Sequence, residues 1–179
     1  MVREISSGGV VLREISGVWH VALIEPQKES SLKERPAIAK SPRKRVKAAL
    51  ALPKGLVDPG ETAPVTAVRE VHEETGIVSE LIAKLADTRY VYVRNWGDGA
   101  RVFKIVTFYL LRYTSGEIDD VTAAMRVEVK RALWIPLLEA SLHLMYSNER
   151  KVLRMAQDYL AARGLAPENA STSPRTTPT

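Results

Sequence analysis

Residues Gly55 to Ile77 read G-L-V-D-P-G-E-T-A-P-V-T-A-V-R-E-V-H-E-E-T-G-I and carry the strongest signal in this chain. A Pro-Gly turn leads into a segment that is predicted to be a helix. Thr62 is a suitable N-cap, Pro64 falls in the first turn, and Gly76 offers a C-cap. The spacing of the other side chains predicts one helical face made of Val65, Val68, Val71 and Thr75.

Three carboxylates crowd one patch of this predicted helix. Glu70, Glu73 and Glu74 stand at i, i+3 and i+4, so they are neighbours on the helix surface. Like charges this close are unfavourable unless a cation lies among them. Oxygen ligands without cysteine or clustered histidine indicate a hard ion, Mg²⁺ first and Mn²⁺ second. Because Mg²⁺ binds a few carboxylates together with waters and substrate phosphates, the pattern predicts a phosphate-bearing substrate. The alternative is a solvated acidic helix face.

The segment resembles the signature of the Nudix hydrolases, G-x5-E-x7-R-E-U-x-E-E-x-G-U, where U is aliphatic. Every specified position is filled, and a chance match is on the order of 10⁻¹⁰ per window. The resemblance covers roughly residues 3–163 and implies an α/β fold, a Nudix-type α/β/α sandwich with a mixed β-sheet. The matching residues are Gly55, Glu61, Arg69, Glu70, Val71, Glu73, Glu74, Gly76 and Ile77.

This resemblance also implies roles for single residues. The three helix glutamates would be metal ligands, and one of them or a distal carboxylate would activate the attacking water. The carbonyl of Lys54 would supply another metal contact. Arg69 and Glu61 are expected to form a structural pair that holds the loop against the helix and orients Glu70. Direct catalysis by Arg69 is the alternative.

Flanking motifs bear on the substrate. Residues 52–55 (L-P-K-G) and 104–110 (K-I-V-T-F-Y-L) resemble motifs of diadenosine polyphosphate hydrolases in the same superfamily. Residues 128–134 reproduce an E-x5-W spacing, in which Glu128 would be the distal metal ligand or base. Lys54 and Lys104 are candidates for contacting phosphates. The candidates for stacking on a base are Tyr92, Phe108 and Tyr109.

Two features leave the base undecided. Aromatic residues that alternate along strands are also typical of a core. The tryptophan that usually stands two residues before the L-P-K-G leucine is Leu50 here.

The remaining sequence alternates predicted strands with a few helices. Gly17 falls in a short turn between the first two strands, which favours a hairpin. Strands flanked by helices predict a mixed sheet between helical layers. The predicted strands span 8–12, 18–24, 77–83, 90–94, 102–112 and 132–135, and the later helices begin near 137 and span 149–163.

Positive charge is concentrated in a predicted insert at residues 27–47. It holds eight Lys and Arg against two Glu, so the net charge of +5 resides here and the remainder is close to neutral. A basic loop beside an acidic metal site could attract polyphosphate or RNA. A solvated flexible insertion is the alternative. We expect one domain at residues 1–164, including this insert, and a disordered tail at 165–179 rich in Ser, Thr and Pro.

The sequence therefore predicts a metal-dependent hydrolase that cleaves a phosphoanhydride bond in a nucleoside diphosphate linked to another group. The first choice of substrate is a dinucleoside polyphosphate such as diadenosine tetraphosphate, and a nucleoside triphosphate, including an oxidised one, is the alternative. A nucleic-acid-binding or regulatory Nudix module is a third hypothesis, which the intact carboxylate set argues against.

The composition also indicates where the protein acts and which chemistry it cannot use. No long apolar run or signal peptide is evident, so we expect no membrane partner and a cytoplasmic location. The absence of cysteine excludes disulfides and thiol catalysis. The oligomeric state stays open.

Overall fold

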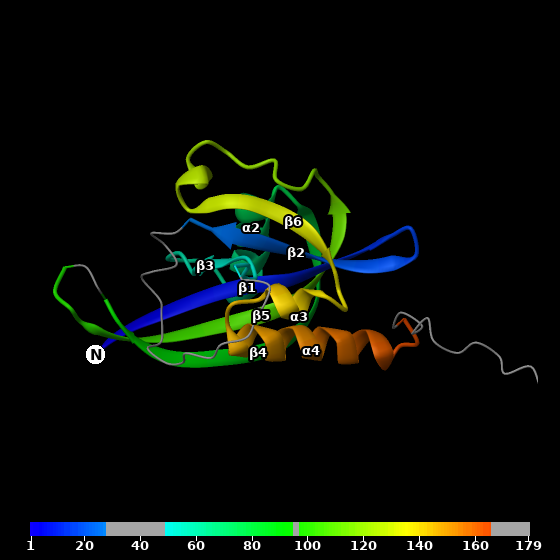
Figure 1. Cartoon of the computed structure of the whole chain (residues 1–179). Helices are drawn as coiled ribbons and strands as arrows, with labels where there is room; N and C mark the ends of the chain where they lie inside the picture. Colours follow the sequence, from blue (N-terminus) through cyan, green and yellow to red (C-terminus); the bar gives the residue numbers. More distant parts are fainter. Residues whose placement is uncertain (28–48, 95–96, 166–179) are drawn as a thin grey trace, which may run out of the picture.

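The computed structural model describes residues 1–27, 49–94 and 97–165 (Figure 1). The predicted basic insert beyond Gln27 and the predicted tail beyond Leu165 lie outside the described residues. The elements in chain order are β1 (Val2–Ile15), β2 (Val18–Pro26), β3 (Lys54–Leu56), α2 (Ala63–Thr75), β4 (Val78–Val93), β5 (Arg101–Ser115), the 3-10 helix η1 (Met125–Val127), β6 (Val129–Pro136), α3 (Ala140–His143) and α4 (Ser147–Ala161).

The strands form one mixed sheet in the order β4-β5-β1-β2-β6, with β3 paired to β1 outside this path. Strands β1 and β5 are parallel, and the other described pairs of strands are antiparallel. The predicted hairpin is confirmed. Ser16 and Gly17 both have positive φ, 51° and 78°, as a two-residue type I′ turn requires.

One difference from the sequence prediction concerns β4. The two strands expected at 77–83 and 90–94 are a single strand, Val78–Val93, that pairs with β5 along its length. Register shifts between Leu81 and Ala83 and between Lys84 and Ala86 interrupt the alternation of side chains. Such bulges add an unpaired residue without ending the strand, which explains why the sequence pattern breaks there.

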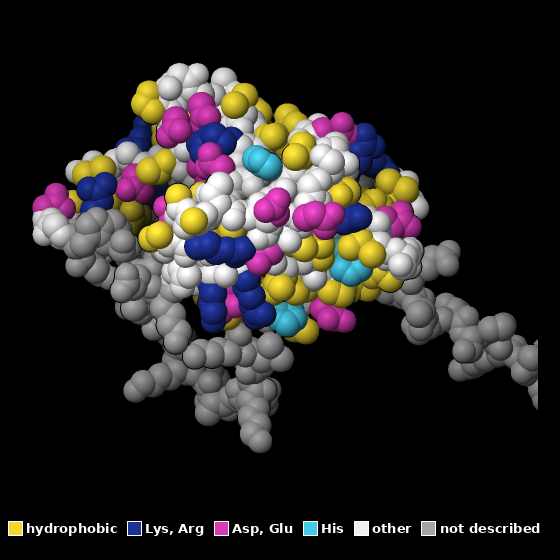
Figure 2. Space-filling view, turned by 90° about the horizontal axis from the view of Figure 1, so that it is seen from above, with side chains coloured by type: hydrophobic (Ala, Val, Ile, Leu, Met, Phe, Trp, Pro, Cys, Tyr) yellow, Lys and Arg dark blue, Asp and Glu magenta, His cyan; other side chains and the backbone are white. Residues whose placement is uncertain are grey.

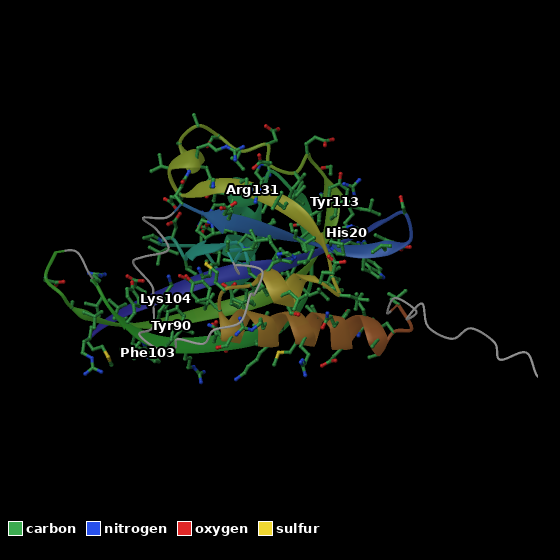
Figure 3. All side chains as sticks on the ribbon, viewed as in Figure 1. His20, Tyr90, Phe103, Lys104, Tyr113 and Arg131 are labelled. Atoms are coloured by element: carbon green, nitrogen blue, oxygen red, sulfur yellow. The ribbon has the colours of Figure 1, made fainter. Side chains whose placement is uncertain are left out.

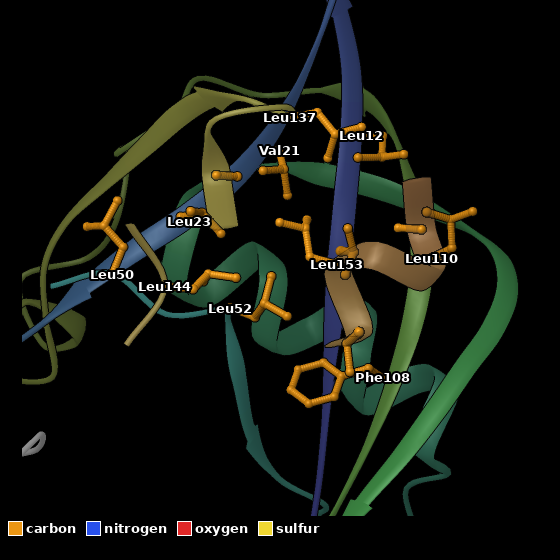
Figure 4. Close-up of a cluster of buried hydrophobic side chains, with 14 of the residues drawn as sticks. Leu12, Val21, Leu23, Leu50, Leu52, Phe108, Leu110, Leu137, Leu144 and Leu153 are labelled. Atoms are coloured by element: carbon orange, nitrogen blue, oxygen red, sulfur yellow. The ribbon is translucent and has the colours of Figure 1, made fainter. Parts of the chain in front are cut away.

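The sheet is covered on both faces by helices (Figure 1). On one face, Val10 and Leu12 of β1 join side chains of α3 and α4 in the largest core cluster (Figure 4). On the other face, Val11 packs with Ala67 and Val71 of α2. Successive strand residues point to opposite faces, so β1 supplies both cores. The predicted α/β/α sandwich with a mixed sheet is confirmed.

The helix expected from about residue 137 is short, because Leu137 still donates its backbone N–H to the Trp19 carbonyl at 2.8 Å and α3 begins only at Ala140. No helix in the described part of the chain is both long and apolar enough to cross a membrane. Acidic and basic side chains are interspersed on the face shown in Figure 2, in keeping with a near-neutral body outside the insert.

Candidate functional site

Helix α2 turns two glutamates toward the sheet. Ala67 and Val71 are fully buried, and Glu70 and Glu74 are only 8% and 6% exposed. On the predicted face of this helix, Val71 and Thr75 are buried, whereas Val65 is 56% exposed. The buried side of the helix includes the glutamates rather than an unbroken apolar stripe. Buried carboxylates need compensating partners, which Arg69 of the same helix and the backbone of β3 supply.

Arg69 ties the loop, the helix and two of the glutamates together. Its Nε and Nη2 donate to both carboxylate oxygens of Glu61, at 2.8 and 2.9 Å. Its Nη1 donates to Glu70 at 2.8 Å and to Glu73 at 3.0 Å. Nη2 also donates to the Leu56 carbonyl at 3.1 Å. The predicted pair of Arg69 and Glu61 is therefore present, and it fixes the Glu70 carboxylate as expected.

Strand β3 lies directly against the two buried glutamates. The backbone N–H of Lys54 donates to Glu74 Oε2 at 2.8 Å. A Cβ added to Gly55 would come within 2.2 Å of the carboxylate of Glu70, so this close approach requires glycine. At the far end of the helix, Gly76 has φ of 80° and donates its N–H to the His72 carbonyl, which confirms the predicted C-cap.

The carboxylates of this cluster differ in the direction in which their pKa values are shifted. Hydrogen bonds from Arg69 and Thr66 lower the pKa of Glu61 to about 2. Burial raises the pKa of Glu74 to about 8, against the opposing effect of Lys54. Burial also raises the pKa of Glu70, although Arg69 acts in the other direction. The negative charge of Glu128 adds to the rise at both buried residues, which places it near them.

Six of the predicted site residues meet in one cavity of about 370 Å³. Its wall includes Gly55 of β3, Asp58 of the following loop, and six residues predicted to bind metal or substrate. Lys104 lies on β5, is 7% exposed, and is paired in register with Tyr90 of β4 (Figure 3). The six predicted residues on the wall are Lys54, Glu70, Glu73, Glu74, Lys104 and Glu128.

The donor set fits a hard cation, but it is not drawn together into a finished site. Among the described residues, no group of three Asp, Glu or His side chains is close enough to hold a metal ion. In this arrangement Arg69 Nη1 donates to both Glu70 and Glu73, while Glu74 accepts from β3. Burial and mutual repulsion disfavour the charged forms of Glu70 and Glu74, and a bound cation would relieve both effects.

The three aromatic candidates for base stacking do not line this cavity. Phe108 is 1% exposed within the core cluster on the α4 side, and Tyr109 is 8% exposed in the cluster under α2. Both lie on β5, an inner strand covered on both faces, so neighbouring residues of this strand point into opposite cores. Tyr92 pairs its ring with Tyr90 and donates its hydroxyl to Glu4 at 2.8 Å. Their burial leaves Phe108 and Tyr109 little ring surface for a base, whereas the half-buried Tyr92 stays a candidate.

Several cavity residues were missed from the sequence, Met125 and Tyr146 among them. Met125 and Tyr146 line the wall together with the predicted carboxylates. The only usable signal was the position of Met125, three residues before Glu128 and therefore within reach of the same turn. Tyr146 directly precedes α4, and nothing in its local sequence marks it as a cavity residue.

The fold and the site together define a class of protein: an α/β/α sandwich that presents helix glutamates and two lysines to one cavity. Comparison with protein families gives that class its name. The NUDIX domain family matches residues 15–156, and the chain belongs to this family.

Two curated relatives were found in mycobacteria. The chain is 35% identical over 159 residues to a Mycobacterium tuberculosis protein named "Putative mutator protein MutT4", covering 89% of this chain and 56% of that protein. It is 36% identical over 103 residues to an "8-oxo-(d)GTP phosphatase" of Mycolicibacterium smegmatis, covering 58% and 28% respectively. The chain thus spans about half the length of the first relative and less of the second.

Solved structures agree on the fold. A C. elegans Ap4A hydrolase in a binary complex has a TM-score of 0.58 at 22% identity, covering 89% of this chain and 98% of that one. A MutT NUDIX hydrolase from Burkholderia pseudomallei has a TM-score of 0.59 at 22% identity, covering 87% and 98%. At this level of identity the likeness shows the fold alone.

Proposed function

We propose that this protein is a metal-dependent hydrolase that cleaves a phosphoanhydride bond in a nucleoside diphosphate linked to a further group. The observation that carries this proposal is the convergence of four glutamates and two lysines on one cavity in a NUDIX fold. Acidic and basic side chains in one cavity suit a substrate that brings phosphate oxygens and needs a cation.

The basic and the acidic residues of the cavity have different roles in this reaction. Lys54 and Lys104 attract and orient the phosphate chain, and the burial of Lys104 strengthens that attraction by excluding water. Arg69 acts as a positioning residue, because it holds the carboxylate of Glu70 while it anchors the loop through Glu61. One of the cavity carboxylates accepts the proton of the attacking water.

The cation-binding set comprises oxygen donors from three parts of the chain. When bound, Mg²⁺ or Mn²⁺ neutralises charge on the phosphate oxygens. The residues that would hold it are Glu70, Glu73, Glu74, Glu128 and the carbonyl of Lys54. The raised pKa values of Glu70 and Glu74 fit this role, since both carboxylates gain more from a nearby cation than an exposed carboxylate would.

Two substrates remain in competition. A nucleoside triphosphate, including an oxidised one, is supported by the name of the Mycolicibacterium smegmatis relative, an 8-oxo-(d)GTP phosphatase. Diadenosine tetraphosphate is supported by the flanking motifs around Lys54 and Lys104.

The test is a phosphate-release and product-mass screen of the purified chain with Mg²⁺ over both kinds of substrate. We expect turnover that EDTA abolishes and that Glu74→Gln reduces by roughly 10²–10⁴ in kcat. Glu139→Gln, which changes an exposed glutamate outside the cavity, is the matched control and should keep the wild-type rate. Full turnover in EDTA, or a Glu74→Gln rate equal to that of the control, would overturn the proposal.

A further inference from the structure

The cavity has a second, apolar half that the chemistry of phosphate cleavage does not use. Beside the carboxylates and lysines, its wall contains Ile24, Pro26, Ala51, Met125 and Tyr146. A site that handled phosphate alone would have no need of this surface. The polar and apolar parts share one cavity, so a ligand with an anionic end and a flat apolar end would occupy both.

The residues of the apolar half are held in place by the surrounding fold. Ile24 at the end of β2 and Ala51 before β3 exchange two backbone hydrogen bonds of 2.9 Å. The side chains of Ile24 and Ala51 are buried in a small core cluster. Met125 and Tyr146 pack against this cluster. Met125 and Tyr146 remain half-buried, so each keeps part of its surface toward the cavity.

The turn that carries Met125 is also held in place. Gln27 donates its side-chain amide to the Arg126 carbonyl at 2.9 Å and its backbone N–H to the Glu128 carbonyl at 2.8 Å. Glu128 in turn donates its N–H to the Met125 carbonyl at 2.9 Å. Hence η1 and its C-cap residue present an apolar side chain and a predicted distal carboxylate, three residues apart, to the same cavity.

We propose that Tyr146 and Met125 bind the nucleobase of the substrate, with the base stacked on the Tyr146 ring and covered by the Met125 thioether. This inference rests on the proposed function, because that function supplies the nucleotide whose phosphates lie at the polar half. Aromatic rings stack on any base, and a thioether adapts to a flat ring.

The same wall predicts weak discrimination between bases. Among the apolar-half residues that the structure describes, the Tyr146 hydroxyl is the one polar side-chain group. Discrimination by more than a few tens of fold requires hydrogen bonds to the base edge, whereas an apolar pocket distinguishes similar rings poorly. The site therefore accepts purine bases generally and takes most of its binding energy from stacking.

Calorimetric titration with GMP, AMP and ribose 5-phosphate in the presence of Mg²⁺ tests this inference without requiring turnover. The wild-type protein should bind both purine nucleotides at least about tenfold more tightly than ribose 5-phosphate, and equally to within about tenfold. Tyr146→Ala should remove that preference and leave ribose 5-phosphate binding unchanged. Tyr146→Phe keeps the ring and should retain the preference, while Met125→Ala should lose part of it.

Two further tyrosine variants serve as a control and as a test of a competing position. Tyr159→Ala, on α4 outside the cavity, is the matched control and should retain the wild-type preference. Tyr92→Ala tests the strand surface beside Lys104. Loss of the preference in Tyr92→Ala but not in Tyr146→Ala would overturn the proposal, as would equal wild-type binding of GMP and ribose 5-phosphate. A large preference for one base that disappears in Tyr146→Phe would overturn the stacking argument.

Failure of the proposed function is a separate result. It would appear as a wild-type protein that hydrolyses none of the nucleotides in the turnover screen, whatever the titrations show.

Discussion

Replacing Arg69 with lysine should show whether Arg69 positions Glu70 for catalysis or only stabilises the fold. Lysine keeps the positive charge but has a single nitrogen, which cannot contact both oxygens of Glu61 and reach Glu70 at the same time. Of the hydrogen bonds that the guanidinium makes, most would be lost, including the two to Glu61 and the one to Glu70.

The cost can be estimated from those contacts. Charge-assisted hydrogen bonds contribute roughly 1.5–3 kcal/mol each when buried, but the Arg69 side chain is 25% exposed, so solvent screening reduces each to about 1 kcal/mol. A loss of about 2–3 kcal/mol in the free energy of unfolding follows. For a chain of this size that corresponds to a fall in Tm of roughly 4–12 °C. Because Glu70 loses its fixed orientation, kcat should fall by about 10–10²-fold while KM changes little.

Thermal melts and steady-state kinetics on the best substrate from the screen would measure both effects. Arg94→Lys is the matched control, since Arg94 is 28% exposed and pairs with Glu4 at 3.1 Å outside the cavity. It should lower Tm slightly and leave kcat unchanged. A wild-type kcat in Arg69→Lys at a temperature where the variant is folded would refute the positioning role, and an equal kcat loss in both variants would show a general effect of destabilisation.

Three other outcomes are expected. Glu128→Gln should lower kcat at least tenfold with little change in Tm, and a larger kinetic effect in Glu117→Gln, which lies outside the cavity, would mean that the distal carboxylate is misplaced. Gly55→Ala forces the glutamate beneath it to move and should cost roughly 1–3 kcal/mol of stability together with most of the activity, so a fully active variant in an assay at 25 °C would contradict the close packing. The pKa of Glu61 is depressed to about 2 in the folded state, so its stabilising effect is present above its ordinary value of 4.5 and is lost as pH falls toward 2. The difference in Tm between the wild type and Glu61→Gln should therefore be constant from pH 5 to 7 and shrink below pH 4.5, and a difference that grows on acidification would reverse the assigned direction.

The sequence by itself determined the features that depend on neighbours along the chain. The bounds of α2, its glycine C-cap and the spacing of its glutamates all follow from residues within about 20 positions of one another, whereas the pairing of Arg69 with Glu61 was implied by the resemblance to the Nudix signature. Local backbone preferences and helix periodicity govern such features, so a single segment contains the information. The turn at Gly17 was predictable for the same reason.

Only the tertiary structure decided which side chains face the cavity. Phe108 and Lys104 lie on the same strand, yet one is sealed in the core and the other reaches the cavity, because their surroundings come from other elements. The apolar half combines residues near positions 24, 51, 125 and 146, which no local pattern connects. Burial depends on which distant segments cover a strand, and that information appears only when the sheet and its helices are assembled.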